Sequence, residues 1–373
     1  MTGADPNDLP AMDVAGRLPR LRASLDAAGA DALLVTRLVN IRYLTGFTGS
    51  AAMLLVRPDD LVFVTDGRYR DQAADQLAAA GVVADIGIGL GERQREIVGA
   101  AAGDVARLGL EAHAVSWAQQ REFASKWFPD AELVATEGVV EEMRKRKDEG
   151  ELARMAAAAA IADDALASVL PLVVGGAAER DIAIELDFAM RRGGASGPSF
   201  ETIVAAGPNG AKPHARPSTR PIGPGEMVVI DFGAVVDGYC SDMTRTVCVG
   251  EPADPTAARM AEVVAASQAA GVDAVRAGAT AKEVDDACRS IIADAGWADA
   301  FLHGTGHGVG LEIHEAPRVA ATSADSLVAG HVVTVEPGVY LPEHGGVRIE
   351  DTLVVTDNGS RRLTNAPKDL VLT

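Results

Sequence analysis

Hydrophobic and polar residues recur along the chain with two periods, one typical of amphipathic helices and one typical of short strands. In the first third, a helical pattern covers residues 13–30 and ends near Gly29, and another covers residues 71–80 and ends at Gly81. Because strands that alternate with short helices are typical of α/β units, we predict a small α/β domain over residues 10–138. The predicted strands are 32–36, 53–56 and 61–65.

The pattern changes near residue 139, so a second domain is predicted over residues 139–373. Here helices are followed by strands, and the same order then repeats. The first strand-rich stretch begins at Glu201, and the second runs from Val332 to Val355. The repeated order hints at an internal duplication, although no repeat of the sequence itself supports it. The predicted helices are 139–170, 181–192, 257–277 and 281–295.

Composition narrows the class of protein. A chain of 373 residues is expected to form two domains. A hydrophobic content of 48% with 23% charged residues is that of a soluble globular protein. The formal net charge of −19 argues against nucleic acid as a partner, because little positive charge is left to neutralise the phosphates.

The N-terminal residues and the cysteines indicate a cytoplasmic protein. Residues 1–10 are polar and lack the charged-then-apolar pattern of a signal peptide. The most apolar long stretch, 155–174, is interrupted by Asp163, Asp164 and Pro171, so it predicts a packed helix and no membrane span. The chain has 3 cysteines, an odd number without metal-ligand spacing, which fits a reducing compartment.

Five residues in separate glycine-rich patches of the second domain suit a pair of hard cations. Carboxylates and one histidine are ligands for ions such as Mn²⁺ or Mg²⁺, in contrast to the thiolates of many zinc sites. Two cations in an open cleft activate water against a carbonyl or phosphoryl group. The pattern therefore predicts a hydrolase. The residues are Asp231, Asp242, His307, Glu336 and Glu350.

Both aspartates lie near one predicted hairpin. Asp231 ends the apolar run 227–231, and Asp242 follows the dipeptide Asp237-Gly238, which is typical of a tight turn. Such a hairpin can bring both carboxylates to one face of the sheet. Taken alone, either aspartate also fits an ordinary turn or strand-end carboxylate.

The run HGTGHGVG at 303–310 is the most unusual string in the chain. Its glycines let the backbone pass close to a ligand or to a neighbouring strand. A phosphate-binding loop is the rival interpretation, but no Gly-Lys-Ser/Thr follows and no strand with an acidic partner supports a dinucleotide site. His307 and His314 are therefore candidate site residues, with satisfied core or surface histidines as the alternative.

The last two acidic residues each lie beside a predicted strand. Glu336 follows an apolar run and is turned at once by Pro-Gly. In the next strand Val347 and Ile349 are expected on one face, and Arg348 and Glu350 on the other. Arg348 is therefore expected to pair with a metal-binding carboxylate and to orient it.

These strings together resemble the pita-bread family of proline-specific metallopeptidases, the Xaa-Pro dipeptidases (prolidases) and Xaa-Pro aminopeptidases. All five ligand positions match in order, and the strings at 40–47 and 66–69 resemble the smaller domain of that family, so the resemblance covers nearly the whole chain. It implies an α+β fold in which a small N-terminal creatinase/prolidase-like α/β domain precedes a pita-bread catalytic domain with a curved antiparallel sheet. The strings are DFG (231–233), SDMTRT (241–246), HGTGHGVGLEIHE (303–315), VEPGVY (335–340) and GVRIEDT (346–352).

The resemblance also implies a role for each ligand. Asp242 and Glu350 would bridge two cations. Asp231 would complete the ligands of one cation, and His307 with Glu336 those of the other. A hydroxide held between the cations would then attack the scissile carbonyl.

Further residues acquire roles from the same resemblance. Glu336 would move the proton of the attacking water. His214, on a proline-stiffened loop, and His314 would stabilise the tetrahedral intermediate or steer the leaving proline. The residues expected to contact substrate are His303, Arg318, Tyr340 and Arg348.

Arg318 separates two related activities. In the resemblance it occupies the position of an arginine that holds the C-terminal carboxylate of a dipeptide, a group that a guanidinium suits. With a single N-terminal domain, this favours an Xaa-Pro dipeptidase. The alternative is an Xaa-Pro aminopeptidase that acts on longer peptides with proline at the second position, in which case Arg318 would be a solvated arginine after a proline turn.

Other classes share parts of this pattern. A methionine aminopeptidase uses the same ligands in a shorter chain, a creatine-type amidinohydrolase does not need all of them, and a catalytically inactive binding homologue is the non-enzyme alternative. The expected cofactors are two divalent ions, Mn²⁺ in the first place, with Co²⁺, Zn²⁺ or Fe²⁺ as alternatives. The expected partners are short proline-containing peptides and a second copy of the chain in a homodimer, with no nucleic acid and no membrane.

Overall fold

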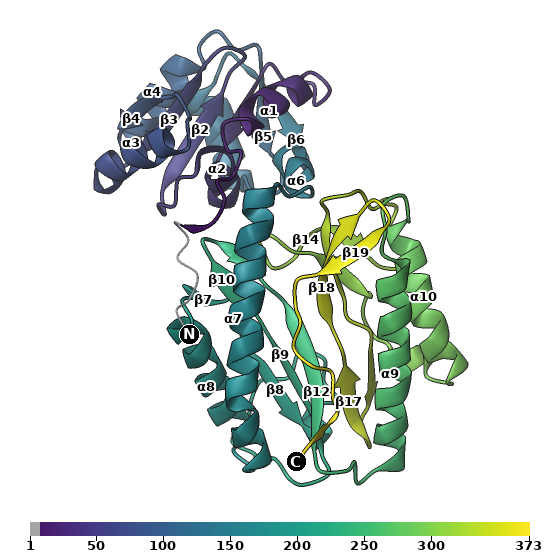
Figure 1. Cartoon of the computed structure of the whole chain (residues 1–373). Helices are drawn as coiled ribbons and strands as arrows, with labels where there is room; N and C mark the ends of the chain where they lie inside the picture. Colours follow the sequence, from purple (N-terminus) through teal and green to yellow (C-terminus); the bar gives the residue numbers. More distant parts are fainter. Residues whose placement is uncertain (1–7) are drawn as a thin grey trace. The chain divides into compact units, whose positions relative to one another are not determined.

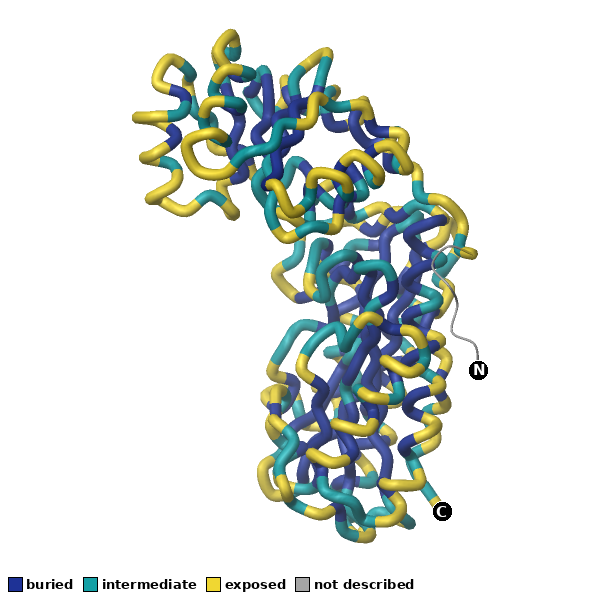
Figure 2. Tube along the Cα trace, turned by 90° about the vertical axis from the view of Figure 1, so that its left-hand side faces the viewer, coloured by how far each residue is buried: buried dark blue, intermediate teal, exposed yellow. Residues whose placement is uncertain are grey.

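The computed structural model describes residues 8–373 and divides into two compact units (Figure 1). The smaller unit spans Met12–Arg144, and the larger spans Lys145–Thr373 with the described residues up to Ala11. Within each unit the buried residues concentrate on the strands, while turns and outer helix faces are exposed (Figure 2). The chain is therefore divided into a small unit and a large unit.

The division follows Arg144, whereas the sequence placed the boundary after residue 138. The difference is the short helix α6 (Val139–Arg144), which packs within the smaller unit. Arg144 Nη1 donates to Asn40 Oδ1 at 2.9 Å, and Asn40 Nδ2 donates to Glu141 Oε1 at 2.7 Å. These buried hydrogen bonds tie α6 to the small unit.

The smaller unit is built on a mixed sheet. In spatial order its strands are β4 (Asp85–Ile88), β3 (Leu61–Thr65), β2 (Ala52–Val56), β1 (Ala32–Val35), β5 (Arg107–Glu111) and β6 (Glu132–Thr136). The predicted strands 32–36, 53–56 and 61–65 are thus confirmed. β1 and β2 are antiparallel, while β5 and β6 continue the sheet in parallel. The remaining helices are α1 (Arg17–Leu25), α2 (Leu38–Thr45), α3 (Arg70–Ala79), α4 (Glu92–Ala101) and α5 (Trp117–Glu122).

Two helix predictions are corrected by local hydrogen bonds. The predicted helix 13–30 is only α1, because the Asp13 side chain accepts from Gly16 N at 3.1 Å in a turn before it, and Gly29 adopts a φ of 74° after it. The predicted helix 139–170 is broken between α6 and α7 (Glu149–Val174). The break forms because Asp148 caps α7 with a capping box to Glu151.

The larger unit repeats the order helix, helix, strands. α7 and α8 (Glu179–Arg192) precede the first strands, and α9 (Pro255–Ala274) and α10 (Ala281–Asp294) precede the second set. In Figure 1, α7 and α8 lie beside the strands of the first half, and α9 and α10 lie beside those of the second. Each helix pair contributes to its own hydrophobic cluster, and the second cluster also includes Met227 and Cys248 of the first half. The predicted repeat of element order is confirmed.

The strands of the larger unit form two principal sheets and two small ones. The first sheet has the order β20 (Val371–Leu372), β12 (Met243–Val249), β9 (Met227–Phe232), β8 (Ile203–Ala206). The second has the order β14 (Glu315–Val319), β13 (Gly306–Gly308), β15 (Val332–Val335), β18 (Asp351–Thr356), β19 (Gly359–Arg362). The small sheets contain β11 (Tyr239–Cys240), β10 (Ala234–Val236) and β7 (Gly197–Pro198), and β16 (Gly338–Leu341) with β17 (Gly345–Arg348).

Helix α7 has the length and apolar character of a membrane span, with a mean hydropathy of 1.8 in its most apolar window. It is instead a core helix, because Ala158, Ala162 and Val169 are buried in the cluster that α7 shares with β9 and β12. The prediction of a packed helix is confirmed.

Candidate metal centre

Both principal sheets supply acidic side chains where their strands end. Asp231 lies in β9, directly opposite Thr244 of β12, and Asp242 comes just before β12. The predicted turn between them is confirmed, because Val236 pairs with Tyr239 and both turn residues have positive φ. The hairpin therefore brings both aspartates to the same end of the sheet.

The second sheet supplies the histidine and the two glutamates. His307 is the middle residue of β13, Glu336 directly follows β15, and Glu350 directly precedes β18. Val335 of β15 pairs with Asp351 of β18, so the two glutamates lie at neighbouring strand ends. The two sheets are joined here, since the Glu350 amide donates to the carbonyl of Thr244 at 3.1 Å.

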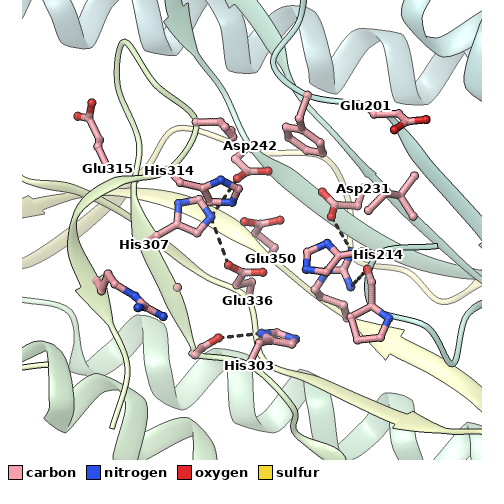
Figure 3. Close-up of a pocket in the computed structure, with 18 of the residues that line it drawn as sticks. Glu201, His214, Asp231, Asp242, His303, His307, His314, Glu315, Glu336 and Glu350 are labelled. Carbon is pink, nitrogen blue, oxygen red and sulfur yellow. Dashed lines mark hydrogen bonds and ion pairs between the residues drawn. The ribbon is translucent and has the colours of Figure 1, made fainter. Parts of the chain in front are cut away.

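These residues surround one cavity of about 920 Å³ in the larger unit. Figure 3 shows the carboxylates and histidines converging on it from both sheets. All but one of the residues predicted for the site line it, and Tyr340 is buried behind Arg348 and His303. The predicted residues that line it are His214, Asp231, Asp242, His303, His307, His314, Arg318, Glu336, Arg348 and Glu350.

His307 faces two carboxylates through the same ring nitrogen. Its Nε2 lies 3.5 Å from Asp242 Oδ2 and 3.4 Å from Glu336 Oε1. Its Nδ1 lies 3.0 Å from the carbonyl of Gly308, which accepts a hydrogen bond only if the proton is on Nδ1. In that tautomer Nε2 carries a lone pair and faces the oxygens of two carboxylates, so three acceptors point at one another. A cation bound between them would stabilise this arrangement.

The carboxylates are held by neighbouring groups, as metal-binding carboxylates commonly are. Arg348 Nη2 donates to Asp231 Oδ2 at 2.6 Å, and the Thr244 hydroxyl donates to Glu350 Oε2 at 2.7 Å. The expected alternation in this strand is confirmed, because Val347 is buried in the core while Arg348 lines the cavity. Arg348 pairs across the sheets with Asp231.

The donor set fits divalent cations. Ligand atoms of Asp242, His307 and Glu350 all lie within 4.8 Å of one another. Among the described residues, Asp231 Oδ1 and Glu350 Oε1 are buried oxygens without a hydrogen-bond partner. Unpaired buried carboxylate oxygens are costly, and a hard cation is the partner that such oxygens prefer. The site therefore has both the ligands and the unmet charge that divalent ions would satisfy.

Electrostatics at the site point the same way. Burial, followed by the charges of Glu350 and Asp231, raises the pKa of Asp242 well above its usual range, and burial raises the pKa of Glu336 to about 8. Burial lowers the pKa of His307 to about 4. The protein thus favours a neutral imidazole, and without cations it disfavours full ionisation of the crowded carboxyl groups.

Stability of the metal-free protein is expected to fall as the pH rises from about 6.5 to 8. In this range the folded chain still holds the Glu336 proton, whose pKa is raised to about 8, while the unfolded chain has lost it. The lowered pKa of His307 acts in the opposite direction only below about 6.5. Urea unfolding after chelation measures this, and Glu336→Gln should reduce the slope. A midpoint that rises over this range would contradict the expectation.

Among the remaining predicted residues, His303, His314 and Arg318 line the cavity, and Tyr340 lies behind its wall. The Tyr340 hydroxyl lies 2.8 Å from His303 Nε2 and accepts from Arg348 Nη1 at 2.7 Å. The His314 ring meets the His307 ring edge-on, with the centroids 4.3 Å apart. Arg318 is exposed and lines the cavity from β14.

Some supporting residues were not found from the sequence. Lys147 Nζ pairs with Glu315 at 2.7 Å, and both side chains are almost fully buried beside the strand that follows His314. The Thr334 hydroxyl contacts the Glu336 carboxylate at 3.3 Å and accepts from His307 N at 3.1 Å. The Lys147–Glu315 and His307–Thr334 partners are far apart along the chain and leave no local pattern in the sequence. Thr334 and Glu336 are only two residues apart, but a Thr-x-Glu spacing is too common to indicate this contact.

Comparison with known proteins places both parts of the chain. Residues 153–357 match metallopeptidase family M24, and residues 17–146 match the creatinase/prolidase N-terminal domain. The chain is 41% identical to an uncharacterized peptidase, YqhT of Bacillus subtilis, over 95% of this chain and 99% of that one. An Xaa-Pro dipeptidase structure from Bacillus anthracis superposes with a TM-score of 0.92 at 38% identity, covering 96% of this chain and all of the other. An X-Pro aminopeptidase structure from Thermotoga maritima gives 0.86 at 32%, covering 95% and 100%.

Proposed function

The chain belongs to metallopeptidase family M24, and on this basis we propose that it hydrolyses Xaa-Pro dipeptides. It has the α+β pita-bread fold, and it is a metal-dependent, proline-specific peptidase. We infer the residues that bind the metal, the identity of the metal and the length of the peptide substrate. Its principal support is the convergence of acidic residues from two sheets on one cavity with unpaired buried oxygens.

We assign two divalent cations to Asp231, Asp242, His307, Glu336 and Glu350, with Mn²⁺ in the first place. Carboxylate-rich sites suit this hard ion, although Co²⁺, Zn²⁺ or Fe²⁺ share the ligands. When bound, such ions make water nucleophilic at neutral pH and polarise a carbonyl. The chain would supply all five ligands from one unit.

The chain's own groups would provide proton transfer and orientation. Glu336 lies in the cavity wall, so its carboxylate can take a proton from the attacking water and return it to the leaving proline nitrogen. The nitrogen of any cleaved peptide bond must receive a proton when it leaves, and the nitrogen of an Xaa-Pro bond, which has no N–H, is no exception. His214 and His314 line the cavity and can donate hydrogen bonds to the developing oxyanion.

Chelation and metal restoration test the proposed function. Treatment with chelator should abolish hydrolysis of Ala-Pro, and Mn²⁺ should restore it, because the ligands alone cannot activate water. Ala-Pro-Gly should be cleaved much more slowly than Ala-Pro. If no divalent metal restored cleavage of either peptide, the proposal that this chain is a metal-dependent peptidase would be refuted. Equal rates on both peptides would instead favour an Xaa-Pro aminopeptidase. The X-Pro aminopeptidase from Thermotoga maritima has the same fold as this chain.

Arg318→Ala is expected to raise KM for Ala-Pro by about tenfold, since a hydrogen bond to a charged group contributes about 1.5–3 kcal/mol and this side chain is exposed. Cleavage of Ala-Pro-amide, which lacks the C-terminal carboxylate, should change little. Steady-state kinetics on the two substrates give the comparison. An equal effect on both substrates would remove Arg318 from carboxylate recognition.

We also propose that the protein is cytoplasmic and forms a homodimer. Cys248 and Cys288 are free and buried, and Cys240 is buried as well, which supports a reducing cytoplasm. A homodimer is proposed from the family resemblance alone.

A further inference from the structure

Helix α10 carries two ion pairs of the same spacing in different surroundings. Asp285 pairs with Arg289 at 3.0 Å, and Lys282 pairs with Asp286 three positions earlier on the helix. The Asp285 side chain is fully buried, whereas those of Lys282 and Asp286 are more than half exposed. A buried carboxylate is retained only where several partners satisfy it, so Asp285 calls for an explanation that the exposed pair does not.

The partners of Asp285 lie in the segment that leads to His307. Asp285 Oδ1 accepts from the Thr305 amide at 3.1 Å and from the Thr305 hydroxyl at 2.9 Å. Both donors belong to the glycine-rich run, where the glycines leave the backbone more conformational freedom than other residues would. The carboxylate therefore fixes this run two residues before the histidine.

Arg289 holds the same segment at two earlier points. Its Nη2 donates to the carbonyl of His303 at 2.8 Å, and its Nη1 donates to the carbonyl of Phe301 at 3.2 Å. The guanidinium also lies 4.2 Å above the Phe301 ring. Arg289 and Asp285 together hold alternate residues from 301 to 305, which is the spacing of one face of an extended segment.

Thr305 also contacts Glu336, the other proposed metal ligand beside His307. The Thr305 carbonyl accepts from the Glu336 amide at 2.8 Å, which fixes the backbone of Glu336 beside the same run. His307 and Glu336 then face each other at 3.4 Å across the cavity wall in Figure 3. Thr305 thus supports both ligands. It binds the backbone of Glu336 directly, and it fixes the segment that leads to His307.

We propose that Asp285 and Arg289 are positioning residues that set the distance between His307 and Glu336, and with it the affinity for the cation these two residues hold. The inference rests on the proposed metal centre. Neither side chain lines the cavity, so they act through the Phe301–Thr305 backbone. Loss of such supporting partners commonly weakens metal binding or activity about 10- to 100-fold.

The test compares Asp285→Asn with Asp286→Asn, the matched change on the exposed face of the same helix. Titration calorimetry of the full-length chelated protein with Mn²⁺ gives affinity and stoichiometry, and Ala-Pro hydrolysis gives kcat and KM. We expect Asp285→Asn to weaken one of the two Mn²⁺ sites about 10- to 100-fold, to lower kcat at limiting Mn²⁺, and to recover part of that loss in excess Mn²⁺. Asp286→Asn should match the wild type.

Two outcomes have separate meanings. Wild-type protein that binds no divalent metal would refute the metal centre itself. Wild-type protein that binds two ions, with Asp285→Asn binding both equally well, would overturn the positioning role alone, even if the variant melts at a lower temperature. If Asp285→Asn does not fold, Arg289→Met at a partly exposed side chain carries the same test with the same outcomes.

Discussion

Asp242→Asn is expected to lower kcat for Ala-Pro by about a thousandfold, because the bound cations supply several kcal/mol of transition-state stabilisation and each 1.36 kcal/mol is a factor of ten. Asp242 is nearly fully buried, lies 3.5 Å from His307 and shares a ligand cluster with Glu350. The substitution keeps the size of the side chain and removes its charge. Bound metal per chain should fall with the rate.

Asp357→Asn is the matched control for Asp242→Asn, because Asp357 lies on the exposed turn after β18. It should leave both kcat and metal content unchanged. The measurements are steady-state kinetics in saturating Mn²⁺ and elemental analysis of the desalted protein. An Asp242→Asn enzyme that keeps two ions and works within a few-fold of the wild type would show that this carboxylate is no bridging ligand.

Glu336→Gln is expected to lower kcat by about 10²- to 10⁴-fold, the usual contribution of a general acid–base group. A carboxyl group can take up and release a proton, which an amide cannot do. KM should change much less than kcat, since the loss falls on the transition state. Glu343→Gln, on the exposed turn seven residues later, is the control.

Metal loss must be separated from proton transfer in this variant. Kinetics of Glu336→Gln at saturating Mn²⁺, with the metal content measured in parallel, make the separation. A variant that carries both ions and yet loses kcat as expected supports a proton-transfer role. A fully loaded variant within tenfold of the wild-type kcat would refute that role.

Much of the fold could be predicted from the sequence, because most helices and strands show a regular alternation of hydrophobic and polar residues. Helices α8, α9 and α10 and the strands around Asp231 are where the periods predicted them. The error came where competing local bonds decided the structure. Asp148 begins a new helix through its capping box, and the Lys147 amide donates to Gly330 far along the chain. Helical periodicity carries no signal of such a break.

The site followed a similar rule. Asp231 and Asp242 could be grouped because one tight turn joins their strands, and Arg348 could be assigned to the cavity face because strand residues alternate. Asp285 could not be found, since its pairing with Arg289 has the same spacing as the exposed Lys282–Asp286 pair. Only the fold distinguishes a buried pair from an exposed one.

Diffraction at the manganese edge tests the central claim most directly. Crystals of the chelated protein reconstituted with Mn²⁺ should show two anomalous peaks in the cavity of the larger unit. Both peaks should contact Asp242 and Glu350, and one should contact His307. A cavity with no anomalous peak, or a single peak away from these carboxylates, would contradict the two-metal peptidase proposed for this chain.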